Sequence, residues 1–187
     1  MSEGRTGGRS APPPGREVHV YTDGASTGSR GPGGYGAVIS FRRGETVEIS
    51  GGERETTNLR MEITAACAAL ERIGEGHTVT VHADASYLIN CMRRGWHEKW
   101  RKNGWLNYRK KPVANRDLWE RLLRATARHG EVRWKKVKGH SRTAGAHKSG
   151  NDRADELAVA AKRRVGDTPR TGGNRAPNGS TASRSVS

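Results

Sequence analysis

The sequence has few cysteines and no long apolar segment. Its two cysteines, Cys67 and Cys91, fall in the apolar registers of two expected helices, which indicates small buried thiols rather than a disulfide or a metal site. No apolar run approaches the ~20 residues of a membrane-spanning helix, and the N-terminus lacks the apolar core of a secretory signal. We therefore predict a cytoplasmic protein in a reducing compartment, without membrane association.

Acidic residues are scarce relative to basic ones. The chain has 19 Asp and Glu against 34 Lys and Arg, which gives a formal net charge of +15. Such a charge suits a nucleic-acid partner, although ribosome-associated and membrane-surface proteins share it. Composition alone does not choose among these classes.

Large apolar side chains are nearly absent from both ends of the chain. Residues 1–16 and 165–187 are rich in Gly, Pro, Ser and Arg, so little apolar burial offsets the entropy of ordering them. We predict that both segments are disordered tails. The remaining residues, 17–164, are numerous enough to form one domain with a hydrophobic interior, which we expect to be monomeric.

The core predicts a mixed α/β fold. Strands are expected at residues 17–24, 36–41, 45–50, 78–83 and 131–139. Helices are expected at residues 59–73, 85–94, 117–130 and 151–164. The glycine-rich segment 28–36 is interpreted as a turn into the second strand, and the short links between the first three strands predict an antiparallel meander.

Residues 93–116 differ from the rest of the core in composition. They contain nine Lys or Arg against one Glu, interleaved with Trp96, Trp100, Trp105 and Tyr108. One interpretation is a solvated helical hairpin whose aromatic residues pack together. The other is a platform for a nucleic-acid backbone. Both hold if the aromatic side chains face inward and the cations face outward.

Four acidic residues stand in distinctive contexts: Asp23 in YTDGAS, Glu62 in NLRMEITAA, Asp84 in VHADASY and Asp155 in NDRADELA. Each one alone has an ordinary explanation, as a turn residue, an exposed helix residue, a helix cap or a helix-surface charge. If folding gathers them, they form a negative site in a positive protein, which suits a hard divalent cation.

Taken together, the motifs resemble a type 1 ribonuclease H of the bacterial kind over essentially all of residues 17–164. The matching segments, in order, are YTDGA with GPGGYGAV, TTNLRMEITAA, DASYLINC, GWHEKWRKNGW with KKPVANRDLW, and WKKVKGHS followed by NDRADELA. The resemblance implies an RNase H-like fold: a five-stranded mixed sheet with its first three strands antiparallel, flanking helices, and a basic protrusion at residues 93–116, called the handle below.

The resemblance also implies an activity, namely hydrolysis of the RNA strand of an RNA/DNA hybrid to leave 5′-phosphate and 3′-hydroxyl ends. Asp23, Glu62, Asp84 and Asp155 match the family's four catalytic carboxylates, which bind two Mg²⁺ ions, with Mn²⁺ as a substitute and with Asp23 contacting both ions. His140 in KGHS matches a loop histidine that helps with proton transfer or product departure. The stretch SRTAGAHKSG that follows it is longer here than in the common bacterial pattern.

Further positions match or depart from the family's substrate contacts. Backbone atoms beside Asp23 and Glu62, together with Asn151, are expected to read the 2′-hydroxyls of the RNA strand. The expected contacts to the DNA strand and along the handle are Thr57, Asn58, Trp96, Arg101, Lys102, Lys110 and Lys111. The departures are Ser29 and Leu59, where relatives often have Asn, and Ser86, where many have Gln, so fewer hydrogen bonds to the hybrid are expected.

Two alternatives remain open at this point. One is a nucleic-acid-binding module with a vestigial metal site, and the presence of all four acids argues against it. The other is a nuclease of the same fold that acts on DNA junctions or transposon ends. The basic handle and the NLRME context favour the hybrid-specific enzyme over that nuclease.

Overall fold

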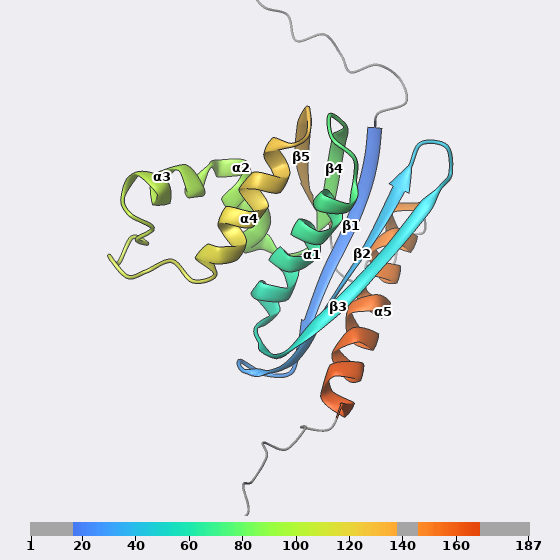
Figure 1. Cartoon of the computed structure of the whole chain (residues 1–187), viewed down its shortest axis with the longest axis horizontal. Helices are drawn as coiled ribbons and strands as arrows, with labels where there is room; N and C mark the ends of the chain where they lie inside the picture. The colour runs from blue at the N-terminus through green and yellow to red at the C-terminus, as the bar shows by residue number, and fades with distance from the viewer. Residues whose placement is uncertain (1–16, 138–145, 169–187) are drawn as a thin grey trace, which may run out of the picture.

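The structure, a computed structural model, describes residues 17–137 and 146–168 (Figure 1). The N-terminal tail predicted at residues 1–16 lies outside the described residues, and so do His140 and residues 169–187 of the C-terminal tail predicted at residues 165–187. Within the described ranges, none of the helices combines the length and the apolar character needed to cross a membrane.

The described chain contains one five-stranded mixed sheet with the strand order β3-β2-β1-β4-β5. The strands are β1 (Glu17–Ser26), β2 (Gly31–Phe41), β3 (Thr46–Thr56), β4 (Thr78–Ala83) and β5 (Glu131–Lys136). The first three are antiparallel, while β4 is parallel to both β1 and β5. The sequence-based prediction of the sheet is confirmed.

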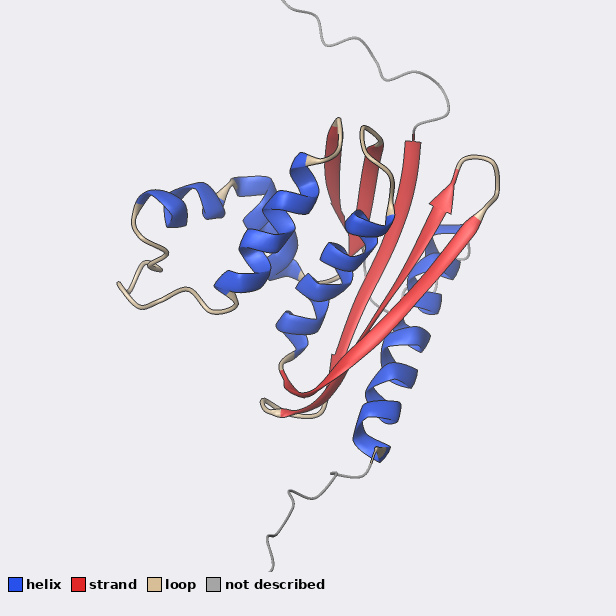
Figure 2. Ribbon diagram, in the orientation of Figure 1, coloured by secondary structure: helices blue, strands red, loops and turns tan. Residues whose placement is uncertain are grey.

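Helices lie on both faces of this sheet (Figure 2). They are α1 (Asn58–Arg72), α2 (Ser86–Arg94), α3 (Trp96–Lys102), α4 (Arg116–Ala127) and α5 (Ala146–Asp167). Alternation along β1 assigns the faces. Val18 and Val20 belong to the large core that α1 and α4 cover, whereas Tyr21 packs with Ala154 of α5 on the other face.

Helix α1 forms where its apolar stripe predicts a helix. Ile63, Ala66 and Leu70 are fully buried at the three- and four-residue spacing of one helix face. At the start of the helix, the Thr57 side chain accepts a hydrogen bond from the Arg60 backbone N–H at 3.2 Å, which satisfies one of the unpaired amides of the first turn. This cap fixes the point at which the chain leaves β3 and enters α1.

The prediction of a turn at residues 28–36 is wrong for residues 31–36, which form the first half of β2. The glycines are there for another reason. A Cβ atom at Gly34 or Gly36 would collide with backbone carbonyl groups of α5. Glycine inside a strand marks such a close approach of another backbone, and here it lets α5 lie directly on the sheet.

Helix α5 is longer than predicted at both ends. It begins at Ala146 rather than residue 151 and ends at Asp167 rather than residue 164. Near its C-terminal end Val165 packs on β3, since a Cβ at Gly52 would lie 2.9 Å from a Val165 methyl group. This contact extends the folded domain beyond the expected start of the C-terminal tail.

The handle consists of the end of α2, α3 and the loop that leads into α4. The left-handed backbone of Gly95 (φ 63°) separates α2 from α3. Trp100 packs against Trp105 and Trp119, with ring centroids 6.3 and 5.6 Å apart. The nine Lys and Arg residues of the window are all exposed, and so is Tyr108 at 87 %. Tryptophans therefore face inward and cations outward, as the combined interpretation requires.

Both cysteines of the described chain are buried and free, which confirms their interpretation as core thiols. The Cys67 thiol on α1 donates to the Leu118 carbonyl at 3.7 Å, so it also joins α1 to α4. Burial raises the pKa values of Cys67 and Cys91 to about 12, and both thiols stay protonated at neutral pH.

Candidate active site

Parallel pairing of β1 and β4 brings two of the predicted acids together. Thr22 pairs with Ala83 in this register, so Asp23 and Asp84 are the next residues on two adjacent strands that run in the same direction. Asp84 directly follows the carboxyl end of β4, which is a recurrent functional position of α/β folds. Strand pairing alone therefore forms half of the site.

Helix α1 delivers the third acid because Gly24 lets it approach β1. A Cβ atom at Gly24 would lie 2.6 Å from the Glu62 backbone nitrogen and 2.9 Å from the Met61 carbonyl carbon, distances that no side chain tolerates. The Gly24 N–H in turn donates to the Asp23 carboxylate at 2.8 Å. One glycine thus orients Asp23 and also admits the helix that carries Glu62.

Asp23, Glu62 and Asp84 form a compact carboxylate cluster. One carboxylate oxygen from each residue lies within 4.8 Å of those of the other two. Glu62 is only 2 % exposed. Its Oε1 atom accepts a long hydrogen bond of 3.5 Å from the Asn58 side chain, and its Oε2 atom has no partner among the described residues. A buried carboxylate oxygen without a donor is suited to binding a cation.

The pKa values of two clustered acids respond to this crowding. Burial, followed by the charges of Asp84 and Asp155, raises the pKa of Asp23 to about 6, although the Gly24 N–H opposes the shift. Burial raises the pKa of Glu62 well above its usual range, and the Asp23 and Asp84 charges add to that effect. A bound divalent cation would reverse both shifts by neutralising the cluster.

Asp155 lies at the edge of the site. It is half-buried on α5 and is not part of the group of three, yet its charge helps raise the pKa of Asp23. The structure therefore brings three of the four predicted carboxylates into direct proximity and places the fourth within electrostatic range. One turn earlier on α5, Asn151 is 8 % exposed, and its Oδ1 atom has no partner in the described ranges.

The predicted substrate contacts fall into two groups. Thr57 and Asn58 lie at the start of α1 beside the cluster. The other group lies on the handle, where Arg101, Lys102, Lys110 and Lys111 are exposed and Trp96 is half-buried. A groove of about 430 Å³ crosses the handle. It is lined by Tyr87, Trp96, Lys99, Trp100, Asn103, Leu106, Asn107 and Tyr108.

Sequence analysis missed the role of Gly24. The first strand was expected to end at this residue, whereas β1 continues through it to Ser26. The signal that would have found it is the position of the glycine: it ends an apolar strand pattern next to a candidate ligand, where close backbone approach is the usual reason for glycine.

Solved structures are similar to this chain in fold. LC9-RNase H1, a type 1 RNase H, aligns over 83 % of this chain and 76 % of its own, with a TM-score of 0.69 and 27 % identity. LC11-RNase H1 in complex with an RNA/DNA hybrid aligns with a TM-score of 0.59 over 79 % of this chain and 98 % of its own, at 24 % identity. The sheet order and the carboxylate cluster thus define an α/β protein of the RNase H-like fold.

Sequence relatives then give the family. The RNase H family model matches residues 15–163, and the chain belongs to that family. It is 50 % identical to Ribonuclease H of Moorella thermoacetica over 146 residues, which cover 78 % of this chain and 91 % of the relative. It is 47 % identical to Ribonuclease H of Chlorobium phaeovibrioides over 150 residues, or 80 % and 97 % of the two chains. Its activity is accordingly that of a ribonuclease H enzyme.

Proposed function

We propose that this chain hydrolyses the RNA strand of RNA/DNA hybrids by a two-metal-ion mechanism, leaving 5′-phosphate and 3′-hydroxyl ends. The observation that carries the proposal is the cluster of Asp23, Glu62 and Asp84 within 4.8 Å. The hybrid complex of LC11-RNase H1 supports the substrate class through similarity of fold.

The residues of the cluster fit Mg²⁺, with Mn²⁺ as a substitute. All the donors are carboxylate oxygens, the ligands that hard divalent cations prefer, and Glu62 Oε2 is buried without a partner among the described residues. Asp23, Glu62 and Asp84 would hold the ions, and Asp155 would complete the site from α5. When bound, such ions activate the attacking water and stabilise the leaving 3′-oxygen.

The chain itself orients these groups. The Gly24 N–H holds the Asp23 carboxylate at 2.8 Å, and Asn58 holds one oxygen of Glu62, so the other oxygen stays directed at the site. A preorganised set of charges costs little rearrangement during the reaction. For His140 we propose assistance with proton transfer or product departure.

Substrate selection is proposed to use two surfaces. Asn151 and the backbone beside Asp23 and Glu62 would read the 2′-hydroxyl groups of the RNA strand, while Thr57 and Asn58 would contact the DNA strand. The exposed cations of the handle and its groove at Trp96 would bind the phosphate backbone further along the hybrid. A monomeric state and a cytoplasmic location remain predictions from the sequence.

Three labelled duplexes test this function: an RNA/DNA hybrid, a double-stranded RNA and a double-stranded DNA, each incubated with Mg²⁺ and with EDTA. We expect Mg²⁺-dependent cleavage of the hybrid alone, within its RNA strand, with 3′-hydroxyl ends. Binding of the hybrid without cleavage would support a vestigial module. Cleavage of the DNA duplex would support a DNA nuclease of the same fold.

Neutralising the handle should weaken hybrid binding in a salt-dependent way. With Arg101, Lys102, Lys110 and Lys111 all changed to Gln, fewer counterions are released on binding, so the slope of log K against log salt should fall by up to about 3 to 4. Affinity measured by fluorescence anisotropy over a salt series checks this. A matched quadruple variant at Arg42, Arg43, Arg128 and Arg133 should keep the wild-type slope, and equal slopes for both variants would exclude the handle as a phosphate-binding surface.

A further inference from the structure

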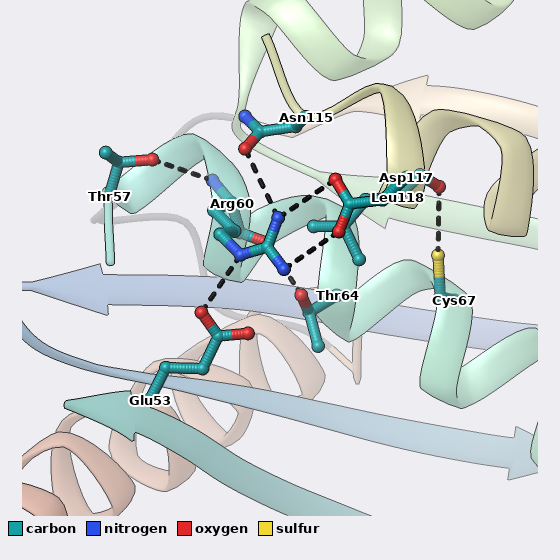
Figure 3. Close-up of polar contacts among 8 residues, drawn as sticks. All are labelled: Glu53, Thr57, Arg60, Thr64, Cys67, Asn115, Asp117 and Leu118. Atoms are coloured by element: carbon teal, nitrogen blue, oxygen red, sulfur yellow. Dashed lines mark hydrogen bonds and ion pairs between the residues drawn. The ribbon is translucent and has the colours of Figure 1, made fainter. Parts of the chain in front are cut away.

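Arg60 lies at the centre of a polar network that joins three elements (Figure 3). Its guanidinium group donates from Nε to Glu53 of β3 at 2.9 Å. From its other two nitrogens it donates to both carboxylate oxygens of Asp117 on α4, at 3.1 and 2.9 Å. A longer bond of 3.5 Å reaches the Asn115 side-chain oxygen. One side chain of α1 therefore contacts the sheet edge and the start of α4 at the same time.

The charges within this network are mutually stabilised. The hydrogen bond to Asp117 raises the pKa of Arg60, and the hydrogen bond to Glu53 and the charges of both carboxylates add to this effect. Partial burial of Arg60 opposes it. The Arg60 bonds hold the pKa of Asp117 below its usual range. The Arg60 side chain is 28 % exposed and that of Asp117 is 62 % exposed, so water screens the bonds to Asp117 and their geometry matters more than their charge.

The network lies between the two proposed substrate surfaces, the carboxylate cluster and the handle. Arg60 precedes the cluster residue Glu62 by two positions on α1. Asn115 and Asp117 stand where the handle returns to the domain, and Asn115 has a left-handed backbone (φ 59°), a conformation that costs energy for a residue with a side chain. The bonds from Arg60 to Asn115 and Asp117 therefore join α1 to the point at which the handle meets α4.

We infer that Arg60 is a positioning residue, which fixes the handle relative to the carboxylate cluster so that one hybrid contacts both surfaces at once. This inference rests on the proposed function. Simultaneous binding at two surfaces of a stiff duplex requires a fixed distance and orientation between them. An arginine suits this role because its planar fork makes two parallel bonds to Asp117 and leaves Nε for Glu53, which a lysine cannot do.

A second ion pair between the same two helices provides a matched control. Arg121 of α4 donates to both oxygens of Glu71 near the C-terminal end of α1, at 2.8 and 2.6 Å. This pair also joins α1 to α4, but Glu71 lies about three turns further along α1 than Arg60. Among the described residues, neither Arg121 nor Glu71 has a hydrogen bond to the handle loop. Loss of either arginine removes an ion pair between α1 and α4. On the proposed role, only the loss of Arg60 also releases the handle.

The experiment compares Arg60→Met with Arg121→Met in steady-state cleavage of a hybrid long enough to span both surfaces. For Arg60→Met we expect KM to rise about tenfold, as ~1.4 kcal/mol of lost binding gives, with kcat within about twofold of wild type. For Arg121→Met we expect both constants to stay near wild type. On a short hybrid that reaches only the cluster, Arg60→Met should match wild type, a result that a merely structural role would not give.

Asp117→Ala keeps the proposal testable if Arg60→Met folds poorly, because the Asp117 side chain is 62 % exposed. It should raise KM in the same way, and the double variant Arg60→Met/Asp117→Ala should be no worse than Arg60→Met, since both changes break one interaction. Equal effects of Arg60→Met and Arg121→Met, or a loss confined to kcat, would overturn the inference. If wild-type protein fails to cleave the hybrid, the proposed function itself is wrong.

Discussion

Asp23→Asn is expected to reduce Mg²⁺-dependent cleavage of an RNA/DNA hybrid by about 10³-fold or more. The substitution removes one of the three clustered carboxylates, and a bound metal ion lowers the barrier of such a hydrolysis by several kcal/mol. Hybrid affinity should change little, because the handle and the helix starts are untouched. Single-turnover cleavage and equilibrium binding measure the two quantities separately.

Glu45→Gln is the control for this variant. It makes the same change from carboxylate to amide at an exposed residue of the β2–β3 turn, at the opposite end of the sheet from Asp23, and it should cleave at the wild-type rate. Activity of Asp23→Asn close to that of Glu45→Gln would exclude a metal mechanism at this cluster.

Asp23→Asn should also stabilise the protein when no metal is present. Asp23 has a pKa of about 6 in the folded protein, above the ~3.8 to 3.9 of an unfolded aspartate. As the pH rises from 4 to 6, the unfolded state loses its proton first, so the stability of the folded state falls. In EDTA at pH 7, Asp23→Asn should therefore gain on the order of 1 to 2 kcal/mol, after allowance for solvent screening.

Denaturant titrations at pH 4.5 and pH 7 measure the free energy of unfolding of Asp23→Asn and of wild type. The gain of the variant over wild type should be larger at pH 7 than at pH 4.5, and added Mg²⁺ should reduce it by binding to the wild-type cluster alone. A variant that is less stable than wild type in EDTA at pH 7 would contradict the charge crowding inferred for the site.

Gly24→Ala is expected to have the second largest effect. Its methyl group would lie 2.6 Å from the Glu62 nitrogen, so α1 must move away from β1 and carry Glu62 out of the cluster. A displacement of about 1 Å at a catalytic group costs about 10²-fold in rate, and overpacking of this kind costs about 1 to 3 kcal/mol in stability. Cleavage rates and denaturant titrations check both numbers.

Gly74→Ala is the matched control, at the other end of α1. A Cβ atom there has an ordinary contact of 3.7 Å to His77, and the residue lies far from the carboxylates. This variant should keep both the rate and the stability of wild type. If Gly24→Ala behaves like Gly74→Ala, close approach of α1 to β1 is not what places Glu62.

Much of the fold follows from patterns of two kinds. Alternation of apolar residues indicated β1 and β4, and the stripe through Ile63 and Leu70 indicated α1, because these elements bury one regular face against a single core. The acidic residues were found because each stands in a distinctive sequence context that matches a motif of the ribonuclease H family, as Asp84 does in VHADASY. Local periodicity therefore predicted most of the strands and helices, whereas the resemblance to ribonuclease H supplied the five-stranded mixed sheet and the candidate cluster.

Features that depend on contact between distant elements were not predictable in this way. Residues 31–36 were interpreted as a turn because glycine usually marks one, and only the packing of α5 on β2 explains the glycines at Gly34 and Gly36. Similarly, Arg60 has the appearance of an ordinary helix-surface charge. Its partners, Glu53 and Asp117, come from elements whose relative placement the sequence does not state.

Anomalous diffraction from crystals grown with Mn²⁺ tests the carboxylate site most directly, since it locates the ions without reference to activity. We predict anomalous peaks within about 2.0 to 2.3 Å of carboxylate oxygens of Asp23, Glu62 and Asp84. Crystals of Asp23→Asn grown in the same way should lose at least one of these peaks. Mn²⁺-dependent cleavage by wild-type protein whose crystals show no peak among the three carboxylates would contradict the account.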